Sequence, residues 1–247
     1  MHFVGRKKEI QKVIKTLEQG ANLIVKGKYG IGRTSLIKHV ARTTKDKWHF
    51  MFVDFSDSSG KMCQKLLKAL LPEKRFTRDQ LLKRFKLQNF KKSLLMILND
   101  SFKDKRKQII VFDNIAKTTP QKLTFIRNLA WAKRFQFIAI VEHFLSEKEL
   151  FLLRAELMPA NILVLSYLSM KEACEFFKQV AQENKFDWSE QYIKMLAKVS
   201  KGYPLGIKEL IAATSAREGT VPYDPKHPDF NGLMLQIRNS KSELQID

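Results

Sequence analysis

One glycine-rich segment has the residue types and the spacing that suit the binding of phosphate groups. Gly27, Gly30 and Gly32 lie close together, and Arg33 and Thr34 follow them directly. Glycines let backbone N–H groups turn inward around a chain of phosphates, and a helix that starts there directs its positive end at the same anion. The Thr34 hydroxyl is placed to hold Mg²⁺. The spacing matches the phosphate-binding pattern G-x-x-x-x-G-K-[ST], with arginine in place of lysine.

The arginine at position 33 changes what this segment can do. Its guanidinium keeps the positive charge but is a planar fork, whereas the expected lysine carries a compact ammonium. The sequence therefore predicts that the chain binds a nucleotide, ATP or ADP with Mg²⁺, and hydrolyses it slowly.

A second chemical feature is an acid at the end of an apolar run. Residues 108–114 read QIIVFDN, with four large apolar residues before Asp113. This pattern predicts a buried parallel strand that delivers Asp113 to its carboxyl end, where α/β sheets bind ligands. The next residue is Asn114, and an amide cannot accept a proton from water.

The apolar pattern predicts the elements that position these residues. The glycine segment lies between a β-branched run and a stretch with apolar residues at helical spacing. The fold class we expect is α/β, with a parallel five-stranded sheet flanked by helices. Its strands are predicted at residues 22–26, 49–56, 108–114, 135–142 and 161–168, and an amphipathic helix is predicted within 3–20.

After residue 168 the pattern becomes helical. Ser169 and Glu172 have the spacing of a capping box, and further helices are predicted at 189–200 and up to about residue 214. We expect an α/β domain at 1–168, a small all-α domain at 169–217 and an extended C-terminal tail at 218–247.

Composition limits the class of protein. With 44% hydrophobic and 28% charged residues the chain is typical of a folded soluble protein, and no apolar run approaches the roughly 20 residues of a membrane span. The N-terminus lacks the apolar core of a signal peptide, so we expect a cytoplasmic protein. The two cysteines, Cys63 and Cys174, are too far apart to indicate a zinc site or a disulfide framework.

The charge is unevenly distributed. The formal net charge is +20, and residues 1–108 hold 27 Lys and Arg against 9 Asp and Glu. Such a field attracts nucleic acid or an acidic membrane surface. Basic runs within 83–107 alternate with phenylalanines that could stack on bases, Phe76, Phe85 and Phe90. The alternative is that the lysines form solvated helix faces and the phenylalanines face the core.

Four motifs occur in an order that resembles the AAA+ and STAND P-loop ATPases. They are the opening VGRKKE at residues 4–9, the glycine segment, the strand ending at Asp113, and Gly202-x-Pro204. The resemblance covers 3–214 and implies an ASCE-type P-loop sheet followed by a helical lid.

The resemblance also implies roles for individual residues. Mg²⁺ would be held by Thr34 and Asp113. The catalytic set would be Asp113, Arg33, Glu142 as a substitute for the glutamate that many relatives have at position 114, and Arg154 as a finger reaching a neighbouring subunit. The nucleotide would be contacted by Val4, Gly5, Arg6, Gly27, Tyr29, Gly30, Ile31, Gly32, Arg33, Thr34, Ser35, Pro204 and Lys208.

Among relatives of this kind, the basic half without a separate DNA-reading domain resembles the transposition regulators of the TnsC and MuB type and the origin-recognition initiators. This implies an ATP-dependent homo-oligomer that binds DNA without sequence preference and recruits a protein partner there. Two alternatives stay open. One is a STAND-like signalling scaffold with a structural nucleotide, and the other is an ATPase held on anionic lipids by its basic face.

Overall fold

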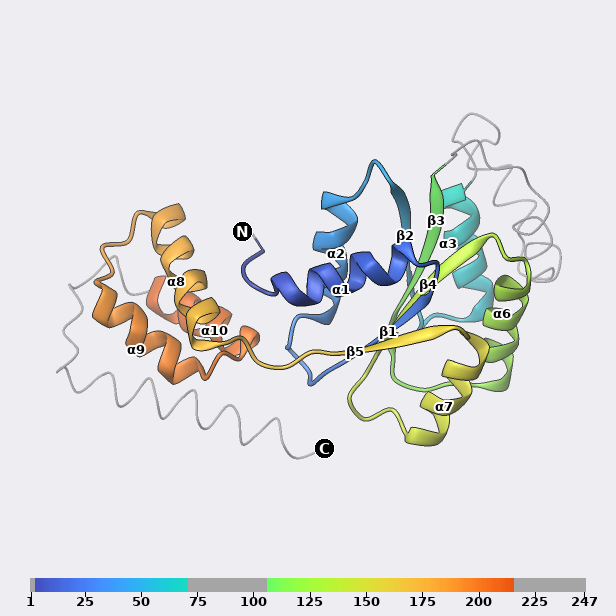
Figure 1. Ribbon diagram of the computed structural model, residues 1–247. Helices are drawn as coiled ribbons and strands as arrows, with labels where there is room; N and C mark the ends of the chain where they lie inside the picture. The colour runs from blue at the N-terminus through green and yellow to red at the C-terminus, as the bar shows by residue number, and fades with distance from the viewer. Residues whose placement is uncertain (1–2, 71–105, 216–247) are drawn as a thin grey trace. The chain divides into compact units, whose positions relative to one another are not determined.

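The computed structural model describes residues 3–70 and 106–215 (Figure 1). The chain divides into two compact units between Tyr167 and Leu168. The basic runs with Phe76, Phe85 and Phe90, and the tail expected from residue 218 onward, lie outside the described residues.

The first unit is built on a parallel sheet of five strands, which confirms the predicted fold class. The strands are β1 (Asn22–Lys26), β2 (Trp48–Asp54), β3 (Lys107–Ile115), β4 (Phe135–Val141) and β5 (Ala160–Val164). Their order across the sheet is β2-β3-β4-β1-β5, and every neighbouring pair is parallel. All five carboxyl ends therefore meet at one edge, with β4 between β1 and β3.

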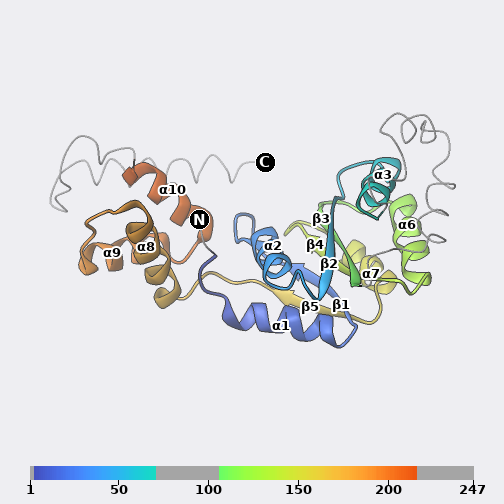
Figure 2. The ribbon, with the colours of Figure 1, turned by 90° about the horizontal axis from the view of Figure 1, so that it is seen from above.

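Helices cover both faces of this sheet (Figure 2). The helices α1 (Lys7–Glu18) and α2 (Arg33–Thr43) pack on one face, where side chains such as Val13 and Leu36 are fully buried. The other face carries α3 (Ser59–Leu70), α6 (Pro120–Trp131) and α7 (Glu147–Glu156). The three inner strands β1, β3 and β4 are buried on both faces, which explains their nearly continuous apolar sequences.

The last strand is shorter than its apolar sequence predicts. β5 ends at Val164 rather than at residue 168, and its final bond to the sheet is donated by Leu165 N–H to the Lys26 carbonyl at 2.8 Å. The reason is the neighbouring strand. β1 ends at Lys26, where the glycine segment begins, so the chain beyond Leu165 has no strand with which to pair.

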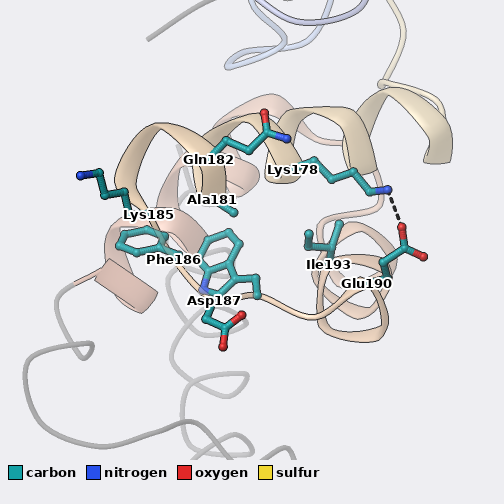
Figure 3. Close-up of a pocket in the computed structure, with 9 residues that line it drawn as sticks. Lys178, Ala181, Gln182, Lys185, Phe186, Asp187, Glu190 and Ile193 are labelled. Carbon is teal, nitrogen blue, oxygen red and sulfur yellow. Dashed lines mark hydrogen bonds and ion pairs between the residues drawn. The ribbon is translucent and has the colours of Figure 1, made fainter.

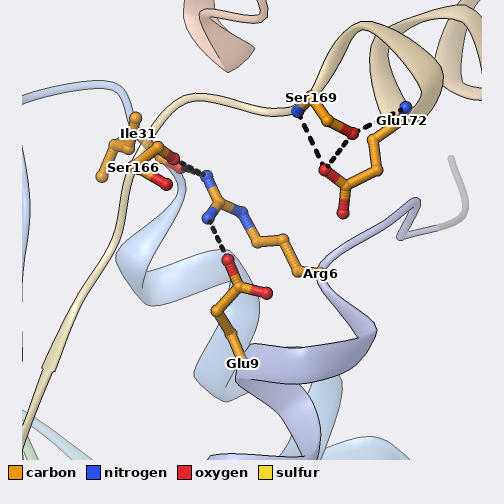
Figure 4. A network of polar contacts seen from close by, with 6 residues as sticks. All are labelled: Arg6, Glu9, Ile31, Ser166, Ser169 and Glu172. Atoms are coloured by element: carbon orange, nitrogen blue, oxygen red, sulfur yellow. Dashed lines mark hydrogen bonds and ion pairs between the residues drawn. The ribbon is translucent and has the colours of Figure 1, made fainter.

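The second unit contains α8 (Met170–Asn184), α9 (Glu190–Ser200) and α10 (Pro204–Ser215). The predicted capping box is confirmed, because the Ser169 and Glu172 side chains bind each other's backbone N–H groups (Figure 4). Between α8 and α9 lies an open hollow of about 470 Å³, floored by Ala181 and Ile193, with the Lys178–Glu190 ion pair at its rim (Figure 3). No helix within residues 3–70 and 106–215 has the length and apolarity needed to cross a membrane.

The backbone of Gly202 packs directly against the start of this unit. A Cβ atom on Gly202 would lie 2.0 Å from the Leu168 carbonyl oxygen, and φ at this glycine is +70°. Leu168 N–H donates to the Gly202 carbonyl at 2.8 Å. The G-x-P motif thus fixes the segment that enters α8, and Pro204 starts α10, where its missing N–H is harmless.

Candidate functional site

The glycine segment connects β1 to α2 at the carboxyl edge of the sheet. A Cβ atom on Gly27 would lie 2.9 Å from Ile31 Cγ2, so only glycine fits there without movement. Gly30 and Gly32 have φ values of +68° and +91°, which glycine adopts most readily. Gly32 caps α2 and supplies no side-chain acceptor, so the first N–H groups of this helix are available to an anion.

Thr34 and Asp113 face each other across this edge. The Thr34 hydroxyl donates to Asp113 Oδ1 at 3.0 Å, and the Asn114 N–H donates to the same oxygen at 3.0 Å. Burial raises the pKa of Asp113, while these two hydrogen bonds and the positive charges of Lys38 and Arg33 oppose the rise. The structure thus brings together two residues that lie 79 positions apart in the sequence.

These two side chains fit a Mg²⁺ ion. A hydroxyl and a carboxylate are ligands that Mg²⁺ accepts, and its charge would stabilise the ionised form of a buried acid. Among the residues that the structure describes, no group of three His, Cys, Asp or Glu could hold a metal ion. Mg²⁺ usually keeps several water ligands and binds substrate phosphates beside one or two protein carboxylates.

Arg33 is bound to the end of β4. Its side chain is only 7% exposed, Nη1 donates to the Val141 carbonyl, and Nη2 lies 2.5 Å from Glu142 Oε2. The Glu142 side chain is 15% exposed. The charge that should meet a phosphate is therefore balanced by a neighbouring carboxylate, and that carboxylate is held by a cation.

Arg6 braces the glycine segment from the N-terminal side (Figure 4). The residue has a left-handed φ of 57° and is 3% exposed. Its Nη2 donates to the carbonyls of Ile31 at 2.8 Å and Ser166 at 3.0 Å, and its Nη1 pairs with Glu9 at 3.3 Å. The side chain expected to line the nucleotide thus binds protein backbone, with Val4 and Gly5 half-buried beside it.

The other predicted site residues are spread over both units. Tyr29 in the glycine segment and Ser35 in the first turn of α2 are exposed, whereas Ile31 is a core residue. Arg154 is exposed on α7. Pro204 and Lys208 belong to α10 in the second unit, so their part in a nucleotide site stays a prediction.

One acid at this edge was not among the predicted site residues. Asp54 ends β2 and pairs in register with Asp113 on β3. Hydrogen bonds from Ser56 and the Asn114 side chain hold the pKa of Asp54 below its usual value. The signal was present in the sequence, since Asp54 also follows an apolar strand.

Comparison with known proteins supplies a family. The family model described as "AAA ATPase domain" matches residues 2–141. No curated protein sequence matches the chain.

Solved structures share the fold at low sequence identity. The Orc1 protein of Aeropyrum pernix in complex with DNA has 13% identity and a TM-score of 0.64, over 99% of this chain and 66% of that one. The RuvB Holliday junction branch migration motor of Thermotoga maritima has 16% identity and a TM-score of 0.59, and the match covers 96% of this chain and 70% of that one. Cdc6p of Pyrobaculum aerophilum has 14% identity and a TM-score of 0.56, and the match covers 88% of this chain and 65% of that one. The chain thus spans just under two thirds of the Orc1 and Cdc6p structures.

Proposed function

The chain belongs to the AAA ATPase domain family, and we propose that it binds ATP with Mg²⁺ and hydrolyses the nucleotide slowly. The observation that carries the proposal is the 3.0 Å hydrogen bond between Thr34 and Asp113. It joins the end of the glycine segment to the acid of β3 at the edge where parallel sheets bind ligands.

Each part of the site has a role in this proposal. Backbone N–H groups from Gly30 to Thr34 surround the phosphates, because left-handed glycines and the start of α2 direct them inward. Thr34 and Asp113 hold the Mg²⁺ ion. When bound, the ion neutralises charge that develops on the phosphate oxygens.

Two substitutions account for slow turnover. Arg33 is paired with Glu142, so its charge is only partly available to the phosphates. Asn114 occupies the position next to the strand acid and cannot accept a proton. Both changes leave nucleotide binding possible while weakening stabilisation of the transition state.

We also propose that the ATP-bound chain assembles on DNA without sequence preference, with Arg154 at a subunit contact and a protein partner recruited there. The net charge of +20 and its concentration in residues 1–108 support DNA binding. So does a stripe of exposed lysines on α1, spaced four and three residues apart, which we call the α1 stripe: Lys8, Lys12 and Lys15. The structure of Orc1 with DNA shows that one protein of this fold binds DNA.

Size-exclusion chromatography with light scattering tests the proposal in three samples: ADP, ATP, and ATP with a DNA duplex. We expect a larger mass with ATP than with ADP, and co-elution of the protein with DNA in the third sample. The Thr34→Ala variant is the matched control and should behave as the ADP sample does. Equal masses in all samples, together with no nucleotide binding by titration, would contradict the proposal.

A second candidate is a STAND-like scaffold that keeps a nucleotide as a structural ligand. The Arg33–Glu142 pair favours it, because a neutralised site binds phosphate without activating it. Phosphate release separates the two candidates. A scaffold shows none above the Asp113→Ala background, whereas a slow ATPase shows turnover that this substitution abolishes.

A further inference from the structure

The proposed hydrolysis of ATP, on which this inference rests, needs a group that accepts a proton from the attacking water. Three carboxylates lie at the carboxyl ends of adjacent strands. Asp54 ends β2, Asp113 lies at the end of β3, and Glu142 follows β4. The proton acceptor should be the carboxylate that neither a cationic side chain nor the proposed metal ion binds.

Two of the three are bound by a cation or assigned to the proposed metal ion. Asp113 accepts hydrogen bonds from Thr34 and from the Asn114 N–H, both on Oδ1, and is the proposed metal ligand. Glu142 lies 2.5 Å from the Arg33 guanidinium and is mostly buried. The Glu142 carboxylate is therefore already occupied by this ion pair.

Asp54 lies next to the metal-site acid, and within residues 3–70 and 106–215 no ion pair holds its carboxylate. It pairs in register with Asp113, and neighbouring strands are about 4.8 Å apart. The Ser56 N–H donates to Asp54 Oδ1 at 2.9 Å. Two lysines on the covering helices act on Asp54 electrostatically, but each binds elsewhere: Lys65 on α3 pairs with Asp57 at 2.5 Å, and Lys122 on α6 donates to the Phe55 carbonyl.

Asn114 links the two strand ends. Its φ is 60°, in the left-handed region that asparagine tolerates better than most residues. Its N–H donates to Asp113, and its side chain is near enough to Asp54 to help lower the pKa of that carboxyl. The amide that replaces the expected acid is thus placed to orient the carboxylate on the neighbouring strand.

We infer that Asp54 accepts the proton of the water that attacks ATP. The water oxygen forms a bond to the γ-phosphorus, and the bond from that phosphorus to the β,γ-bridging oxygen breaks. ADP leaves with the electron pair of the broken bond. The water proton passes to the Asp54 carboxylate, which then releases it to solvent. Asn114 is a positioning residue in this arrangement.

The Asp54→Asn substitution tests the inference, since asparagine retains an oxygen that can accept the Ser56 N–H. General-base removal should lower kcat by about 100-fold or more. Affinity for Mg²⁺ and ATP, measured by titration with a fluorescent ATP analogue, should stay within about twofold. Asp46→Asn removes an exposed carboxylate just before the other end of β2 and serves as the control, with kcat within about twofold of wild type.

Moving the carboxylate gives a readout that a structural role would not produce. The double variant D54N/N114D places an acid on the neighbouring strand end, and aspartate also tolerates a left-handed φ. We expect it to recover at least about tenfold of the turnover lost in D54N.

Three results would overturn the inference. They are wild-type turnover in D54N, a double variant as slow as D54N, or a wild-type chain that binds ATP without hydrolysing it. The last result leaves the nucleotide-binding proposal standing. Failure of the wild type to bind ATP at all would instead remove both.

Discussion

The Arg33 guanidinium lies 2.5 Å from the Glu142 carboxylate, which directly follows the last residue of β4. The sequence places these residues 109 positions apart, and the pairing depends on β4 lying next to β1 in the strand order. A phosphate group that uses Arg33 must compete with this carboxylate. In the proposed nucleotide site, this pair should therefore weaken the binding of a triphosphate to the glycine segment.

Glu142→Gln should tighten the binding of ATP. The substitution removes a negative charge beside the phosphates but keeps an oxygen that can accept from Arg33. We expect affinity to rise by roughly 10-fold, equivalent to about 1.4 kcal/mol. Titration with a fluorescent ATP analogue measures this. Unchanged affinity with lost turnover would instead identify Glu142 as the proton acceptor.

Arg33→Lys should raise turnover, because an ammonium is a compact charge that cannot bind Val141 and Glu142 as a fork does. We expect kcat to rise by about tenfold, which is the effect of about 1.4 kcal/mol on the barrier. Steady-state phosphate release measures kcat for both proteins. Arg33→Ala is the comparison variant and should lower the free energy of unfolding by about 3 kcal/mol, since it leaves Glu142 without its partner. A lysine variant that no longer binds ATP would show that the fork is required.

Asp113→Asn should stabilise the fold while abolishing Mg²⁺-dependent ATP binding. Burial raises the pKa of Asp113, so the folded state favours the protonated acid and is destabilised when the acid ionises. This penalty is absent below the unfolded pKa of about 3.9 and grows as pH rises through the folded pKa. Thermal unfolding at neutral pH should therefore occur a few degrees higher in the variant, with the difference vanishing near pH 3. A difference that grows in acid would contradict the assignment.

Replacing the α1 stripe with glutamines should weaken DNA binding and its dependence on salt. Removing three phosphate contacts should reduce the slope of log affinity against log salt by about 3. Fluorescence anisotropy with a labelled duplex, in ATP and across salt concentrations, measures the slope. The control replaces three exposed lysines of the second unit, Lys171, Lys194 and Lys198, and so removes the same charge. Equal losses in both variants would show that only net charge matters.

Gly202→Ala should destabilise the helical unit strongly. Its Cβ would lie 2.0 Å from the Leu168 carbonyl, and φ is +70°, so the backbone must move. We expect a loss of about 2 kcal/mol or more in the free energy of unfolding. Gly60→Ala is the matched control, because no atom lies within 4 Å of its added Cβ and it sits within α3. Denaturant unfolding followed by circular dichroism compares the two, and equal stability would exclude the close packing at Gly202.

Local patterns were enough to predict the strands and the second-unit helices. Apolar runs marked all five strands, and Ser169 with Glu172 marked the start of α8. The predicted end of β5 was wrong, because the length of this strand depends on where its partner strand β1 ends. The helix α6 was not predicted from apolar spacing, although Thr119 and Pro120 supply an N-cap and a first-turn proline.

Partnerships within the site were harder to predict than its members. The glycine segment and Asp113 could be placed from their own sequences, because phosphate loops and strand-end acids are local features. The strand order determines the other two relationships. It brings Glu142 next to Arg33, and it places Asp54 beside Asp113. Arg6 shows the same limit, since its acceptors at Ile31 and Ser166 are 25 and 160 residues away.

The packing of α3 has a practical consequence for labelling. Cys63 is fully buried on this helix, and burial raises the pKa of its thiol to about 12, so it forms almost no thiolate at neutral pH. The sequence has only one other cysteine, Cys174 on α8, which is partly accessible. A maleimide dye should therefore attach at a single site without any mutagenesis. That dye would report on the helical unit while nucleotide is titrated into the other unit.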